Sequence, residues 1–180
     1  MKRTTAVVLS FVLGLLVIPV GVFLYFEFGH PPVAVADVPF PFESNVVKIP
    51  LSARIGREMP AKSPLAVNDA NLIAGAQVYR EQCSSCHGLK DKPSAFAAYT
   101  FPKTPQLWAR HKNKPGVVGV SDDPVGETYW KVKNGIRLSG MPSYQTLLTD
   151  EQIWQVSTLL SQATSPLPAA AVDSLTAQKP

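Results

Sequence analysis

The stretch that decides the fold is Cys83-Ser84-Ser85-Cys86-His87, which places two cysteines two residues apart and a histidine directly after the second. These are the only cysteines in the 180 residues. A secreted domain held together by disulfides uses more cysteines at wider spacing. A structural zinc site needs a second ligand pair, and the sequence offers none. The two cysteines therefore act together and locally.

A Cys-x-x-Cys-His pattern is the attachment signature of c-type haem. Each thiol can add to one vinyl group of the porphyrin, and the adjacent histidine is then delivered to the iron as its proximal ligand. The alternative is a thioredoxin-like redox pair, which requires a βαβ setting that this sequence lacks. We therefore expect one covalently bound haem c at Cys83, Cys86 and His87.

The residues around this motif have helical periodicity and no strand pattern. A first helix is expected to begin at Asp69, as its N-cap, and to reach Cys83. A second helix is expected over residues 124–134, with proline at its start and glycine after its end. A third is expected over 149–163 and opens with capping-box spacing. These signals predict a small all-α domain.

From Asn68 to Ala163 the sequence resembles the class I cytochromes c. Gly75, Tyr79 and Cys83 have the family's Gly-x-x-x-aromatic-x-x-x-Cys form. A glycine inside a helix costs about 1 kcal/mol, so it usually marks a close backbone approach. In the family, this glycine lets the first helix cross over an aromatic residue of the last helix, a role that Trp154 fits. The resemblance implies three main helices around one haem.

The resemblance also implies a sixth iron ligand. Gly140-Met141-Pro142 is similar to the family's ligand loop, which implies that the Met141 sulfur binds the iron opposite His87. A thioether is a soft ligand that favours Fe(II) and raises the potential. His111 is the competing candidate because imidazole also binds haem iron, although its basic loop favours surface exposure.

Further contacts to the porphyrin are implied by the same resemblance. Pro105-Gln106-Leu107 is similar to the loop after the haem site, where the proline carbonyl accepts a hydrogen bond from the proximal histidine. Trp130 lies in a segment similar to the haem-packing helix, and Trp108 could donate to a propionate. Other expected apolar walls, each of which could equally be core, are Tyr129, Val132, Ile136, Leu138 and Leu159.

The N-terminal segment predicts a membrane anchor. Lys2 and Arg3 precede an apolar run from Ala6 to Phe26, close to the ~20 residues that span a bilayer. A secretory signal has an apolar core of only about 7–15 residues. Residues 34–36, Ala-Val-Ala, nevertheless have the form of a cleavage site. In either case the basic end stays cytoplasmic, so the rest is expected in the periplasm, on a single-pass inner-membrane protein.

The composition of the chain predicts four segments. Residues 1–29 are expected to form the anchor, and 30–68 a proline-rich stalk with a short helical turn at 51–58. The cytochrome domain is expected over 69–164 and a disordered Pro/Ala-rich tail over 165–180.

The net charge of +4 is modest and does not indicate nucleic-acid binding. Basic side chains gather near the motifs, either as a solvated face or as a docking patch for an acidic partner. They are Lys90, Lys92, Lys103, Arg110, Lys112, Lys114, Lys131, Lys133 and Arg137.

These features predict an electron carrier and not an enzyme. A haem with both axial positions filled passes single electrons through its exposed edge and binds no substrate at iron. The expected partners are the membrane and redox proteins such as a quinol-oxidising complex, a dehydrogenase or a terminal oxidase. One alternative is a haem-bearing subunit that catalyses at a labile sixth ligand. Another is a cytochrome subunit fixed inside a larger membrane complex.

Overall fold

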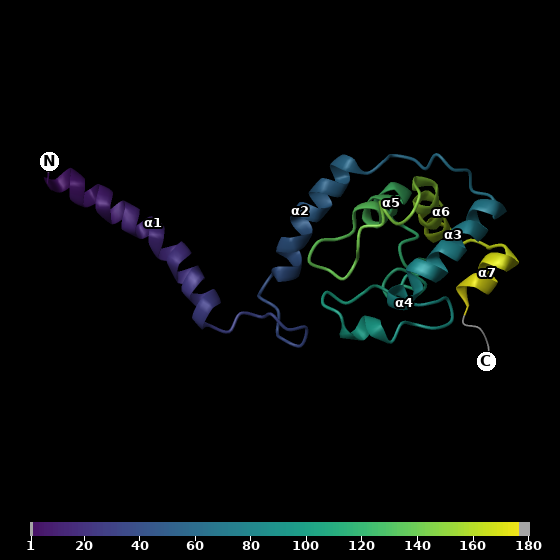
Figure 1. Ribbon diagram of the computed structural model, residues 1–180, viewed down its shortest axis with the longest axis horizontal. Coiled ribbons are helices and arrows are strands. Elements are labelled where there is room, and N and C mark those ends of the chain that lie inside the picture. Colours follow the sequence, from purple (N-terminus) through teal and green to yellow (C-terminus); the bar gives the residue numbers. More distant parts are fainter. Residues whose placement is uncertain (1, 177–180) are drawn as a thin grey trace. The chain divides into compact units, whose positions relative to one another are not determined.

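The computed structural model describes residues 2–176, which form the all-helical protein drawn in Figure 1. Among these residues there is no strand, only an isolated β-bridge between Arg110 and Val118. The predicted all-α class is therefore confirmed. The chain divides into two compact units, Met1–Glu43 and Ser44–Pro180.

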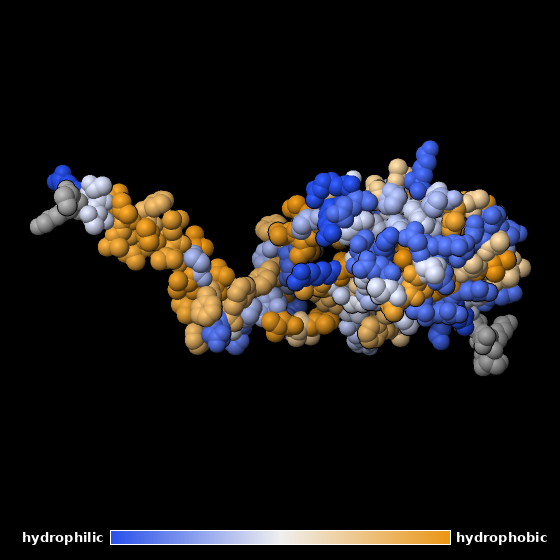
Figure 2. All heavy atoms as spheres, turned by 45° about the horizontal axis from the view of Figure 1, so that its top comes forward, coloured by the Kyte–Doolittle hydropathy of each residue, from blue (hydrophilic) through white to orange (hydrophobic). Residues whose placement is uncertain are grey.

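Helix α1 (Lys2–Phe28) makes up most of the first unit. The part from Arg3 to Phe28 is long and apolar enough to cross a membrane, and none of its most apolar window is buried against protein. Figure 2 shows apolar side chains along this helix. A helix that is apolar all round and uncovered by protein is compatible with a lipid environment.

Helix α2 (Glu43–Glu58) lies where an irregular stalk was predicted. It contains Pro50, and all of it except Glu43 belongs to the second unit, in which Ile55 is only 4 % exposed. The expectation that prolines break any long element was therefore wrong here. Proline removes one backbone hydrogen bond, and the packing of Ile55 together with side-chain contacts near Glu58 supports the helix.

Helix α3 (Asp69–Gln82) crosses helix α6 (Asp150–Ser161) and also packs against helix α7 (Ala169–Leu175) (Figure 1). Its N-cap is Asn68, whose side chain accepts from the Asn71 backbone N–H at 2.9 Å. The predicted cap, Asp69, is instead the first helical residue. There its charge is favourable to the helix dipole.

The close crossing predicted at Gly75 is confirmed. A Cβ atom added to Gly75 would overlap the carbonyl oxygen of Gln155 and lie 3.2 Å from the Leu159 Cβ. The nearest atoms of α6 thus belong to these two residues and not to the expected aromatic residue. The Trp154 ring is stacked on Tyr129, with ring centroids 3.9 Å apart.

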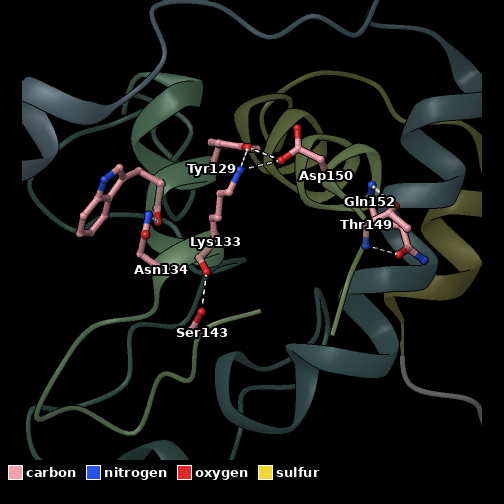
Figure 3. Close-up of polar contacts among 8 residues, drawn as sticks. Tyr129, Lys133, Asn134, Ser143, Thr149, Asp150 and Gln152 are labelled. Atoms are coloured by element: carbon pink, nitrogen blue, oxygen red, sulfur yellow. Dashed lines mark hydrogen bonds and ion pairs between the residues drawn. The ribbon is translucent and has the colours of Figure 1, made fainter. Parts of the chain in front are cut away.

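Helix α5 (Val125–Asn134) packs on α6 and has the predicted bounds, with Gly135 following it at φ 69°. The predicted capping box of α6 is also present. The Thr149 side chain accepts from the Gln152 backbone N–H, and the Gln152 side chain accepts from the Thr149 N–H (Figure 3). The end of α5 is set by a glycine with a positive φ and the start of α6 by two local side chains, which is why the sequence predicts them.

The C-terminal tail is not disordered up to residue 176, contrary to prediction. Helix α7 (Ala169–Leu175) packs against α3 with Ala171 and Leu175 completely buried. The Arg80 side chain of α3 donates to the carbonyls of Ser174 and Thr176. These contacts with distant residues order a segment whose composition suggested disorder. The last part of the predicted tail, 177–180, lies outside the described residues.

Candidate functional site

The end of α3 turns directly into the short helix α4 (Ser84–His87), which carries the motif. The backbone N–H of Cys83 still bonds to the Tyr79 carbonyl at 2.9 Å, and the Cys83 carbonyl then accepts from Cys86 and His87 at 3.2 and 2.9 Å. Residues three apart in one helical turn share a face. Both cysteines are half-buried free thiols on this turn.

The thiol environment does not suit a redox pair. Burial, with a smaller effect of Cys86, raises the pKa of Cys83 to about 12. Cysteines of dithiol oxidoreductases have lowered pKa values, because the thiolate is the reactive form. The structure thus argues against the thioredoxin-like alternative. Within residues 2–176 there is also no group of three or more His, Cys, Asp and Glu side chains that could hold a metal ion.

His87 is held with one ring nitrogen free. Its Nδ1 lies 2.8 Å from the Pro105 carbonyl oxygen, the hydrogen bond expected from the sequence. Because a carbonyl only accepts, Nδ1 carries the proton and Nε2 keeps its lone pair. Burial lowers the pKa of His87 and outweighs the opposing effect of the Pro105 bond. At neutral pH the lowered pKa favours the neutral ring, the form that binds a metal.

Gln106, which the sequence analysis did not assign to the site, ties the Pro105 loop to the motif. Its Nε2 donates to the Cys86 carbonyl at 3.3 Å, and its Oε1 accepts from the Ser94 backbone at 2.7 Å. The next residue, Leu107, is buried and donates from its backbone to the His87 carbonyl at 3.3 Å. In the sequence, the only feature that indicated a place for Gln106 in the site was its position between Pro105 and Leu107, which were assigned to it.

Trp108 offers a direct test of whether a haem fits here. Its indole Nε1 is buried without a hydrogen-bond partner among the described residues. The Tyr79 hydroxyl is close enough for the indole to affect its pKa, but the contact lacks hydrogen-bond geometry. A buried donor without a partner costs roughly 1–3 kcal/mol. An oxygen of a haem propionate would satisfy it, so the free thiols, the free Nε2 and this donor together fit haem c.

Met141 lies in the loop between α5 and α6, half-buried against the core. Its carbonyl accepts from the Ile136 backbone at 3.2 Å, and its N–H donates to the Ser139 hydroxyl at 3.2 Å. The loop turns at Leu138, which has a positive φ of 61° and is 89 % exposed. Leu138, one of the expected walls, is thus on the surface here.

The structure places Trp130 against α2. Its Nε1 donates to Glu58 at 2.9 Å, and the Arg54 guanidinium lies 5.7 Å from the ring centroid. Of the other expected walls, Tyr129, Val132 and Leu159 belong to the core between the helices. Those positions therefore serve packing whether or not a haem is bound.

His111, the competing ligand, is exposed and engaged elsewhere. Its Nε2 lies 2.7 Å from the Gly119 carbonyl oxygen and so carries the proton. In this pose Nε2 has no lone pair for iron, and only Nδ1 keeps one.

Several of the basic side chains near the motifs have acidic partners. Lys114 pairs with Asp122 at 2.7 Å, and Lys131 pairs with Glu127 at 2.6 Å. Lys133 donates to Asp150 at 2.9 Å. Local pairing neutralises part of the predicted docking patch and favours a solvated face at these positions.

Comparison with protein families gives one match, to the family model described as cytochrome c oxidase, cbb3-type, subunit III, over residues 70–160. Searches of curated proteins and of solved structures gave no match. The matched segment runs from the first turn of α3 to the last turn of α6 and includes the Cys-x-x-Cys-His turn and the Met141 loop. Because this match covers half of the chain, the protein belongs to the family of the cbb3-type cytochrome c oxidase subunit III, whose domain is a c-type haem-binding cytochrome c domain.

Proposed function

We propose that this chain is a membrane-tethered c-type cytochrome that passes single electrons between respiratory partners on the periplasmic face of an inner membrane. Its cytochrome c domain implies electron transfer with haem, as an electron carrier and not as a catalytic enzyme. The observation that best supports the proposal is the His87 ring, fixed by the Pro105 carbonyl with Nε2 free, beside two free thiols. Bound there, haem c supplies reversible one-electron chemistry at its iron.

The proposed roles follow from the chemistry of each residue. Cys83 and Cys86 would form the thioether links, and His87 and Met141 would bind the iron. Pro105 fixes the tautomer of His87 and raises the basicity of the nitrogen that faces the iron. Two further residues would surround the haem. Leu107 would be an apolar wall, and the Trp108 indole would donate a hydrogen bond to a propionate. Trp130 stays a predicted porphyrin contact, although its indole N–H is engaged by α2.

The proposal is tested on the full chain purified with its haem. Haem should remain on the protein through denaturing electrophoresis, and replacing Cys83 and Cys86 with Ala should abolish this retention. The ferric protein should be low-spin and show the weak far-red band of sulfur-to-iron charge transfer. Met141→Ala should remove that band and lower the potential, because the thioether's preference for Fe(II) is lost.

Met59→Ala is the matched control, because Met59 is a half-buried methionine outside the Met141 loop. It should leave the spectrum and the potential unchanged. A wild-type iron that is high-spin and binds cyanide rapidly would contradict ligation by Met141. That result would favour the alternative of catalysis at an open sixth position.

The tether and its orientation rest on α1. This helix has the length and composition of a membrane span, and Lys2 and Arg3 at its start favour a cytoplasmic N-terminus. The cytochrome domain would then face the periplasm, whether the anchor is kept or cleaved after Ala36. Fusing a reporter that is active only outside the cytoplasm to the C-terminus should give activity. An inactive reporter with intact protein would refute the orientation.

A second candidate function is a fixed subunit of a larger oxidase complex, which the family's description as an oxidase subunit favours. Mild detergent solubilisation followed by gel filtration distinguishes the two. Co-migration of the haem-stained chain with large membrane subunits supports the fixed subunit. Elution as a small species supports a tethered shuttle.

A further inference from the structure

We propose that Tyr144 is a positioning residue that holds the Met141 loop against the end of α3. The inference rests on the proposed function, because it takes Met141 as the sixth iron ligand. Fe(III) is a harder ion than Fe(II), so a soft thioether binds it less firmly. The occupancy of that bond therefore depends on how well the loop is ordered before the sulfur binds.

The Tyr144 side chain reaches from the Met141 loop to the attachment segment. Its hydroxyl donates to the Gln82 carbonyl at 2.8 Å, and Gln82 is the last residue of α3, directly before Cys83. Burial raises the pKa of Tyr144, and the neighbouring thiols of Cys83 and Cys86 add to the shift. One side chain thus links the segments that would hold the iron from its two sides.

The Tyr144 backbone fixes the same residue to α5 and to the turn before α6. Its N–H donates to the Val132 carbonyl in the last turns of α5 at 3.1 Å. Its carbonyl accepts from Leu147 and Leu148 at 3.0 and 2.9 Å, in the turn that leads into α6. Tyr144 is therefore a common contact of α3, α5 and the turn that precedes α6.

The chain between Met141 and Tyr144 has little conformational freedom. Pro142 fixes its own φ. The Ser143 hydroxyl donates to the Lys133 carbonyl at 2.7 Å, as Figure 3 shows. The loop also lies directly on Gly135, where an added Cβ atom would come within 2.7 Å of the Pro142 carbonyl carbon. Movement at the tyrosine is thus transmitted to the methionine over a short, restrained path.

The test compares the wild-type holoprotein with Tyr144→Phe, which keeps the ring and removes only the hydroxyl. Imidazole is titrated into the ferric protein, where it competes with the Met141 sulfur for iron. Loss of the Gln82 hydrogen bond should make imidazole binding roughly fivefold tighter, the factor that corresponds to one ordinary hydrogen bond. The far-red band should also disappear at a lower temperature, while the haem stays attached.

Tyr99→Phe is the matched control, because Tyr99 also carries a phenol but is 78 % exposed. It should bind imidazole like the wild type. Ser143→Ala removes a second restraint on the same loop, so it should shift imidazole binding in the same direction as Tyr144→Phe. This second variant also serves if Tyr144→Phe folds poorly.

The outcomes separate this inference from the proposed function. A high-spin wild-type protein would refute ligation by Met141, and with it this role of Tyr144. A low-spin wild type, with wild-type imidazole affinity in both Tyr144→Phe and Ser143→Ala, would refute only the positioning role. Tighter imidazole binding in Tyr144→Phe but not in Tyr99→Phe would support it, since a purely structural role would lower overall stability and leave ligand competition unchanged.

Discussion

Among single residues, Gly75 has a clear steric role, because the α6 backbone occupies the space that a side chain would need. We predict that Gly75→Ala lowers the free energy of unfolding by about 1–3 kcal/mol, since the added methyl group meets the backbone of Gln155 and cannot be relieved by a rotamer change. Chemical denaturation of the holoprotein, followed by circular dichroism, measures this.

Gly56→Ala is the matched control. Gly56 also lies inside a helix, but an added Cβ atom there would have no neighbour within 4 Å. Alanine is the better helix former, so this change should stabilise α2 by up to about 1 kcal/mol. Equal destabilisation by both substitutions would show that helix propensity, and not the crossing, determines the effect.

Among the helices, α2 is attached to the cytochrome domain through one polar clamp. Glu58 accepts from the buried Trp130 indole, and Arg54 both lies over that ring and pairs with Glu58 at 2.9 Å. We predict that Glu58→Ala releases the second half of α2, because the indole donor loses its partner. Hydrogen exchange of the 51–58 amides should become faster, with little change in α3 and α6.

Glu58→Gln separates the hydrogen bond from the charge. Its amide oxygen can still accept from Trp130, so most of the protection should remain. Ser52→Ala, at an exposed position of the same helix, should leave exchange unchanged. Protection of 51–58 that survives Glu58→Ala would mean that the burial of Ile55 alone holds α2 in place.

The contact between α5 and the start of α6 should depend on pH. Tyr129 and Lys133 of α5 both donate to Asp150, as Figure 3 shows. These hydrogen bonds, that of Tyr129 first, lower the pKa of Asp150 below its ordinary value of 3.8. A carboxylate with a lowered pKa stabilises the fold above its unfolded-state pKa, and this contribution is lost as the pH falls through the folded-state value.

We therefore predict that Asp150→Asn destabilises the protein at pH 7 and that the difference from wild type shrinks below about pH 4. The effect should not exceed about 1 kcal/mol, because the Asp150 side chain is 60 % exposed and its charge is screened by water. Chemical denaturation of both proteins between pH 3 and 7 measures this difference in the free energy of unfolding. Asp173→Asn, at an exposed position of α7, is the control for the loss of one carboxylate and should leave the stability at pH 7 close to that of the wild type.

For the whole molecule, α1 predicts how the protein behaves in membranes. The full chain should stay in the membrane fraction after an alkaline or high-salt wash, because salt screens charge but does not extract a spanning helix. A chain in which a cleavable secretory signal replaces residues 2–28 should appear in the soluble fraction with its haem spectrum intact. Mass spectrometry of the mature protein would reveal cleavage after Ala36, and release of the uncleaved chain by salt alone would contradict the anchor.

The features that the sequence predicted correctly depend on residues close together in the chain. The Cys83–His87 motif lies within one helical turn, so its chemistry can be read from spacing alone. The same holds for the capping box at Thr149 and for the end of α5 at Gly135, where side chains and a positive φ set the helix ends locally. The apolar run of α1 likewise needs only length and composition.

The features that the sequence missed depend on partners far apart in the chain. Of α2, only a short helical turn at 51–58 was expected, but the helix begins at Glu43 and its Glu58 meets Trp130 across 72 residues. The C-terminal segment was expected to be disordered, but it buries Leu175 against α3. Tyr144 meets the Gln82 carbonyl across 62 residues. No local periodicity encodes such pairs, because burial and hydrogen bonding between distant segments exist only once the helices have packed.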